Sequence, residues 1–211
     1  MAREMDLDRI QHSFQLTKRW FATRNLTTFK TYILPEWKDK SCHYLELGVF
    51  EGYSLCWMLQ KVLLHPDSRA VGIDPHLITA KIDGPAMEAV MLRARHNIIP
   101  WKDRCQLIRG NSAEVLRKML RSRSGWMGVK AKSVDLCMVD GNHNALAVLD
   151  DLRLVIRLVR KGGWIVLDDV ENDQKKNDHV KQGLAMFLDE RGQDLELVFK
   201  HRYIETYKVL R

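Results

Sequence analysis

YLELGVFEGYS, residues 44–54, is the stretch that decides the fold of this chain. Tyr44, Leu45 and Leu47 form an apolar run that is typical of a strand buried on both faces of a parallel sheet. Gly48 and Gly52 end this run, and the residues that follow continue with helical character. The stretch therefore predicts a strand, a glycine turn and the start of a helix.

The glycine turn is suited to a small anionic ligand. Glycine has no Cβ, so the backbone at Gly48 and Gly52 can lie against a ligand while the N–H groups of the next helix point at its negative charge. Glu46, at the end of the strand, offers an acceptor to the same ligand. The spacing is G-x-x-x-G and lacks the central glycine of a dinucleotide site. A packed turn without a ligand is the alternative.

Composition indicates an ordinary globular chain. The 211 residues are 45% hydrophobic and 29% charged, which suits one compact domain, with residues 1–40 expected as an N-terminal helical cap on a domain of residues 41–211. No window approaches the ~20 apolar residues of a membrane span, and no signal peptide is expected. The four cysteines form no C-x-x-C pair, which favours buried thiols and predicts a cytoplasmic protein: Cys42, Cys56, Cys105 and Cys137.

The rest of the chain predicts alternating helices and strands. The expected helices are residues 6–22, 27–34 (ending at Pro35), 84–97, 113–120, 144–159 (closed by Lys161-Gly162-Gly163) and 179–191. The expected further strands are residues 69–73, 105–108, 134–139, 164–167, 195–199 and 203–209. This order predicts an α/β fold, a Rossmann-like doubly wound sheet of seven strands that is mostly parallel and ends in an antiparallel hairpin.

Polar residues follow the second and third strands. Asp74 stands where a Rossmann-like unit places the carboxylate that binds ribose hydroxyls, although an aspartate here can also cap a helix. Asn111 and Ser112 follow the third strand, and Ser112 can equally be the N-cap of the next helix.

Three carboxylates follow the fourth and fifth strands: Asp140, Asp168 and Asp169. Neighbouring parallel strands lie ~4.8 Å apart, so these groups would repel one another strongly without a cation. An all-oxygen set favours Mg²⁺, Ca²⁺ or Mn²⁺ over zinc, whereas an Asp-Asp pair alone often only caps a turn. His143 stands three residues after Asp140 and is expected to face the same crevice, unless it merely caps the next helix or orients a carboxylate.

The order of these motifs resembles a known family. ELGVFEGYS, GIDP, VDGNH and GGWIVLDD, between residues 44 and 170, resemble the class I S-adenosylmethionine (SAM) O-methyltransferases of the metal-dependent catechol, caffeoyl-CoA and macrolide-sugar branch. The resemblance implies that the metal is held by Asp140, Asp168 and Asp169 and that His143 is the general base. It also implies a set of cofactor-binding positions: Glu46, Gly48, Gly52, Tyr53, Ser54, Asp74, Asn111, Ser112 and Asp140. Asn111 departs from the aspartate that is common there.

These observations predict a SAM-dependent, Mg²⁺-assisted O-methyltransferase that acts on a hydroxyl of a sugar, a polyketide or a phenolic compound. The alternatives are an RNA ribose methyltransferase, suggested by the net charge of +7 and the basic residues 117–132, a nicotinamide-dependent oxidoreductase, and a binding module without activity. A homodimer is expected, because Phe14, Trp20 and Phe21 supply more apolar surface than a peripheral helix needs.

Overall fold

The computed structural model describes residues 11–77, 84–126, 128–170 and 179–211. Seven strands form one sheet in the order β3-β2-β1-β4-β5-β7-β6. Strands β1 to β5 are parallel, and β7 is antiparallel to both β5 and β6. The bounds are β1 His43–Leu47, β2 Arg69–Asp74, β3 Cys105–Arg109, β4 Val134–Val139, β5 Val159–Leu167, β6 Leu195–His201 and β7 Ile204–Val209. The predicted fold class is confirmed.

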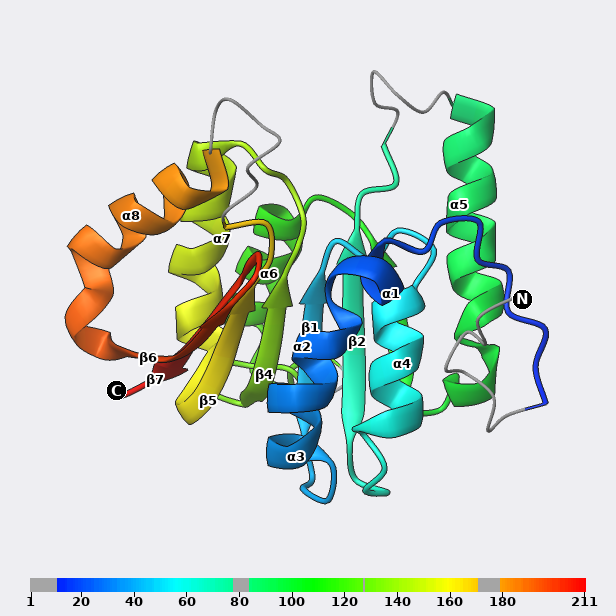
Figure 1. Ribbon diagram of the computed structural model, residues 1–211, viewed down its shortest axis with the longest axis horizontal. Coiled ribbons are helices and arrows are strands. Elements are labelled where there is room, and N and C mark those ends of the chain that lie inside the picture. Colours follow the sequence, from blue (N-terminus) through cyan, green and yellow to red (C-terminus); the bar gives the residue numbers. More distant parts are fainter. Residues whose placement is uncertain (1–10, 78–83, 127, 171–178) are drawn as a thin grey trace.

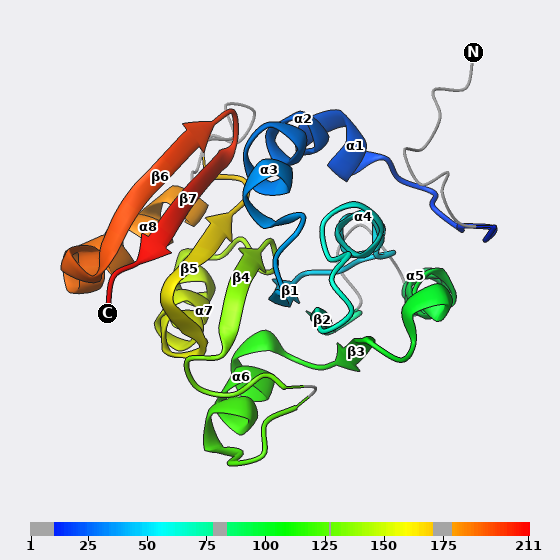
Figure 2. The same cartoon turned by 90° about the horizontal axis from the view of Figure 1, so that it is seen from below.

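Helices cover both faces of the sheet. One face carries α6 (Ser112–Arg121), α7 (Ala145–Leu158) and α8 (His179–Arg191), and the other carries α4 (Tyr53–Lys61), α5 (Gly84–Asn97) and the N-terminal helices (Figures 1 and 2). The N-terminal helices are α1 (Trp20–Arg24), α2 (Leu26–Thr28), a π-helix (Phe29–Ile33) and α3 (Leu34–Trp37), and short 3₁₀ turns span Ile99–Trp101 and Gly192–Asp194.

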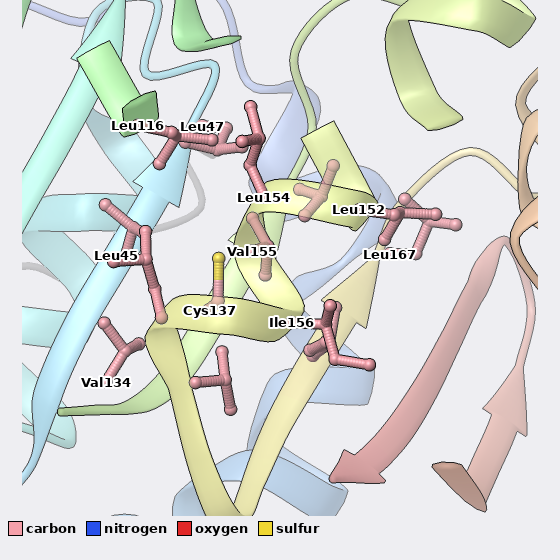
Figure 3. Packing of buried hydrophobic residues seen from close by; sticks show 14 of the residues in the cluster. Leu45, Leu47, Leu116, Val134, Cys137, Leu152, Leu154, Val155, Ile156 and Leu167 are labelled. Carbon is pink, nitrogen blue, oxygen red and sulfur yellow. The ribbon is translucent and has the colours of Figure 1, made fainter. Parts of the chain in front are cut away.

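The central strands are buried on both faces, which explains their nearly continuous apolar sequence. Cys137 of β4 lies beside Val155 of α7, and Leu45 of β1 belongs to the same buried cluster (Figure 3). Tyr44, the neighbour of Leu45, points to the opposite side and belongs to the cluster around α4. α7 places an apolar residue every three or four positions, so its buried side chains form a stripe along the side that faces the sheet.

The expected helix of residues 6–22 is wrong over residues 11–19, which are not helical; residues 6–10 lie outside the described ranges. In this stretch the backbone N–H groups of Gln15 and Thr17 donate to the side chains of Asn97 and Glu51 instead of to carbonyls one turn earlier. Distant polar side chains thus replace the hydrogen bonds that a helix would have made. The helical spacing of apolar residues in the sequence therefore did not indicate a helix.

Two other boundaries differ from expectation. The helical run does not end at Pro35 but continues to Trp37, because a proline in the first turn of a helix removes an N–H that needs no partner there. Residues 161–163 do not close a helix; they lie within β5, after α7 has ended at Leu158. A Cβ at Gly163 would stand 2.8 Å from the carbonyl oxygen of Asp135, so the strands at this point need a glycine.

The aromatic residues expected to form a dimer surface are partly used within the chain. Phe21 is buried against Phe29 and Trp57, and Phe14 stacks on Trp101. Trp20 remains 53% exposed. The homodimer therefore stays a prediction that rests mainly on Trp20.

The four cysteines are free and buried, as predicted. Among the described residues, no helix has both the length and the apolar character needed to cross a membrane.

Candidate active site

The site lies where the strand order reverses, between β1 and β4. At this switch point the carboxyl ends of parallel strands leave a crevice for a ligand. The glycine turn follows β1, Asp140 follows β4, and Asp168 and Asp169 follow β5. Gly48 has a φ of 85°, and a Cβ there would stand 1.9 Å from the carbonyl oxygen of Asp140. Glycine is thus required at position 48 because two loops of the site touch, a reason that the sequence did not reveal.

The glycine turn is held in place by Asp74. One carboxylate oxygen accepts the N–H groups of Val49 and Phe50 at 2.8 Å each, and the other accepts the N–H of His76 at 2.7 Å. Gly52, with a φ of 81°, then begins α4. A carboxylate has about four lone-pair positions, so Asp74 keeps capacity for another donor. Its assignment to the ribose of a cofactor remains a prediction.

Glu46 lies behind the glycine turn, and its assignment to the cofactor remains a prediction. Its side chain is fully buried and accepts hydrogen bonds from the hydroxyls of Tyr44, at 2.7 Å, and Ser54, at 2.5 Å. Burial, with smaller contributions from Asp140 and Asp74, raises the pKa of Glu46 to about 8 against the hydrogen bonds that lower it. Glu46 therefore connects β1 to the first turn of α4.

A group of possible metal ligands gathers in front of the turn. The His143 ring lies between two carboxylates, with Nε2 at 3.6 Å from Asp140 and Nδ1 at 3.5 Å from Asp169. One ligand atom from each of the three residues lies within 4.8 Å of the others. Asp169 is 5% exposed and has a φ of 58°, a conformation that is rare for residues other than glycine and that often marks a functional site.

Asp168 lies next to this group but points elsewhere. Its Oδ1 accepts the N–H of Asp169, and its Oδ2 accepts a hydrogen bond from the Asn25 amide. Burial, followed by repulsion from Asp140 and Asp169, raises the pKa of Asp168 well above its usual value, and burial also raises that of Asp140. The repulsion from which a cation was predicted is thus present, while the role of Asp168 as a ligand stays a prediction.

Two residues of the N-terminal segment reach the carboxylates, and sequence reasoning missed both. Arg24 of α1 forms an ion pair with Asp169 and lies 4.6 Å from the centre of the Tyr203 ring. Asn25 binds Asp168. No motif marks these residues, and about two thirds of the chain separates them from their partners.

Glu51, a member of the opening stretch without a predicted role, joins the glycine turn to the N-terminal segment. It is 1% exposed and accepts hydrogen bonds from the backbone and the hydroxyl of Thr17, both at 2.7 Å, and from Arg93 at 2.6 Å. The Trp20 ring, three residues after Thr17, lies 4.8 Å from that of Phe50. The N-terminal segment therefore runs directly beside the turn.

A family model of the methyltransferase domain matches residues 45–170. The match begins within β1, ends just after Asp169, and so includes every strand end described above. The chain belongs to this methyltransferase family. The prediction that the chain is a methyltransferase is thus confirmed.

Solved structures show the same fold at low sequence identity. A putative O-methyltransferase from Klebsiella pneumoniae is 17% identical with a TM-score of 0.58, over 94% of this methyltransferase and 84% of that chain. MycE of mycinamycin biosynthesis, in complex with Mg, S-adenosylhomocysteine (SAH) and mycinamycin VI, is 18% identical with a TM-score of 0.55, over 93% and 51%. A TDP-rhamnose 3'-O-methyltransferase of calicheamicin biosynthesis is 16% identical with a TM-score of 0.58, over 90% and 81%.

A curated relative, an uncharacterized protein of Acanthamoeba polyphaga mimivirus, is 25% identical to this methyltransferase over 131 residues. The match covers 61% of this chain and 52% of the relative, so it spans about half the length of that protein.

In this methyltransferase, the polar residues that follow β3 make hydrogen bonds within the chain. Asn111, not Ser112, is the N-cap of α6, and its side chain accepts the N–H of Glu114 at 3.2 Å. Ser112 is the first residue of the helix and hydrogen-bonds to Asp151, whose pKa is raised to about 6 mainly by burial. The assignment of both residues to the adenine side of the cofactor stays a prediction. Residues 171–178, a polar loop whose sequence suits either a wall of the substrate site or a plain surface connection, lie outside the described residues.

Proposed function

We propose that this methyltransferase transfers the methyl group of SAM to a hydroxyl of a small molecule, a sugar, a polyketide or a phenolic compound, with the help of a divalent metal ion. The observation that carries the proposal is the position of His143 between Asp140 and Asp169, beside the glycine turn. It supplies a proton acceptor and anionic ligands at one point of the crevice.

The residues at this point fit a divalent cation. The carboxylates of Asp140 and Asp169 lie on either side of the His143 ring, and a third carboxylate, Asp168, lies next to them. Asn25 is 4% exposed, and its Oδ1 has no hydrogen-bond partner in the described structure, which leaves one more buried oxygen near the carboxylates. Such oxygen-rich sets favour Mg²⁺ or Mn²⁺. When bound, the cation would lower the pKa of an acceptor hydroxyl.

The residues of the chain would share the remaining work. The turn from Gly48 to Gly52, with Tyr53 and Ser54 at the start of α4, would hold the methionine portion of SAM, and Asp74 would bind its ribose. His143 is 36% exposed, so an acceptor can reach its ring. As a neutral imidazole it would take the hydroxyl proton, while the crevice holds the acceptor oxygen close to the methyl group.

Two structural neighbours support a small-molecule acceptor. MycE was solved with Mg, SAH and a macrolide, and a second neighbour is named for its action on TDP-rhamnose. Both share the fold of this chain.

The proposal is tested in two steps. Calorimetry should show binding of SAM and SAH but not of NAD. A screen of sugars, macrolides and phenols with labelled SAM should then yield a methylated hydroxyl product whose formation stops in chelator and returns with Mg²⁺. Binding of NAD alone, or methylation of RNA but of no small molecule, would overturn the proposal. Product formation that chelator leaves unchanged would remove the metal from it.

A further inference from the structure

Arg24 places a positive charge on the carboxylate that faces the predicted metal position. Its guanidinium forms an ion pair with Oδ1 of Asp169, while Oδ2 of the same carboxylate faces His143 at 3.5 Å. The Arg24 side chain is 32% exposed and Asp169 is nearly buried. The Tyr203 ring flanks the guanidinium at 4.6 Å, so both an ion pair and an aromatic contact hold Arg24 there.

The formal charges of this region sum to a net negative charge that one divalent cation would neutralise. Asp140, Asp168 and Asp169 carry three negative charges when ionised, and Arg24 supplies one positive charge. Asn25, the partner of Asp168, is neutral. A net charge of two negative units remains, and one Mg²⁺ or Mn²⁺ would neutralise it.

We infer that Arg24 is a positioning residue that serves as the internal counter-ion of the metal site. It stabilises the charge of Asp169 before a metal binds. It also lowers the affinity of the site for the metal, so that a bound divalent ion can exchange. The inference rests on the metal site of the proposed function. Its physical basis is that a cation on Oδ2 and the guanidinium on Oδ1 share one carboxylate and repel each other across a partly buried region, where such repulsion is much stronger than in water.

The test measures metal affinity directly, with the full chain. Free Mn²⁺ is followed by electron paramagnetic resonance during titration of the wild type and of the neutral variants Arg24→Met and Arg24→Gln. We expect both variants to bind Mn²⁺ about tenfold more tightly or more, and Tb³⁺ to gain more affinity than Mn²⁺, because the repulsion removed grows with the charge of the ion. Arg24→Lys, which keeps the charge, should stay near the wild-type affinity.

Stability provides the second readout. In chelator, Arg24→Met should melt at a lower temperature than the wild type, and added Mn²⁺ should raise its melting temperature by more than it raises that of the wild type. The matched control is Arg160→Met, which breaks another arginine–carboxylate pair, with Asp135, at the opposite end of the sheet. This control should leave the affinity for Mn²⁺ unchanged.

The possible failures are distinguishable. If the wild type binds Mn²⁺ and the neutral variants bind it equally or more weakly, the counter-ion role is wrong and the proposed function stands. If the wild type binds no Mn²⁺, the metal site itself is absent, and both the inference and the metal part of the proposed function fall. Calorimetry with SAM reports separately whether each variant retains its fold.

Discussion

Three residues of the site other than glycine have a left-handed backbone: Phe50, His76 and Asp169. Such conformations cost on the order of 1–3 kcal/mol each and persist only where surrounding contacts impose them. Here the contacts are visible. The Asp74 carboxylate binds the N–H groups of Phe50 and His76, and Arg24 and Asp168 hold Asp169. At the residue scale, carboxylate side chains thus hold these three residues of the site in unfavourable backbone conformations.

His143→Ala should lower kcat about 100-fold or more, the usual contribution of a general base, while leaving the affinity for SAM nearly unchanged. The measurement is steady-state turnover on a verified acceptor, with SAM binding followed by calorimetry. His65, with a side chain of similar exposure beside Asp67 and ahead of the amino end of β2, provides the control, and His65→Ala should keep normal turnover. Near wild-type turnover in His143→Ala would show that the ring only orients the neighbouring carboxylates.

At the scale of elements, the N-terminal segment and the glycine turn form one unit. Glu51 receives Thr17 and Arg93, and Asn97 of α5 donates to the backbone carbonyls of Gln15 and Glu51. The segment that precedes α1, the glycine turn and α5 are thereby linked through buried polar groups. A site that sequence motifs assign to strand ends also depends on this segment.

Glu51→Gln should destabilise the protein by about 1–3 kcal/mol, because Arg93 and the Thr17 backbone lose a buried charged acceptor. The affinity for SAM should also fall, since the turn is then less well fixed. Urea unfolding and calorimetry measure the two effects. Glu36→Gln, which breaks an exposed pair with Lys40 just beyond the end of α3, should change neither the stability nor the affinity for SAM by a measurable amount. A Glu51 variant as stable as the wild type would show that the link carries no energy.

At the scale of the whole molecule, Glu46 lies at the centre of the sheet, buried between β1 and α4, so its ionisation affects global unfolding. In the unfolded chain it ionises near its ordinary value of 4.5, whereas in the folded chain burial raises its pKa to about 8. Between these values the folded state binds more protons, so stability falls as pH rises. The contribution is fully present below about pH 4.5 and is lost as the pH passes the folded pKa.

Glu46→Gln, which cannot ionise, should remove this part of the pH dependence. The free energy of unfolding is measured in urea at pH 5, 6, 7 and 8, and it should fall less steeply with pH in the variant than in the wild type. The difference between the two proteins should change by a few kcal/mol across this range, on the order of the energy that corresponds to the pKa shift of Glu46. Asp151, whose pKa is also raised, makes the same contribution to the pH dependence of stability in both proteins. Parallel pH profiles would show that Glu46 is already ionised in the folded state.

Much of the architecture was determined by the sequence alone. The strands from residue 134 to 139 and around the glycine turn, the long helix α7 and the final hairpin follow from local periodicity and glycine placement, which depend on neighbours in the chain. The same is true of the carboxylates at strand ends, because parallel strands bring their carboxyl ends to one edge whatever the details of packing.

Tertiary structure alone decided which of these groups meet. Asp168 and Asp169 are adjacent and chemically identical, yet of the two Asp169 faces His143, because the backbone is left-handed at Asp169 and Asn25 holds Asp168. The pairing of Arg24 with Asp169, and the non-helical path of residues 11–19, likewise depend on partners far along the chain. Local sequence does not encode such contacts, since their energy exists only once the sheet has brought the partners together.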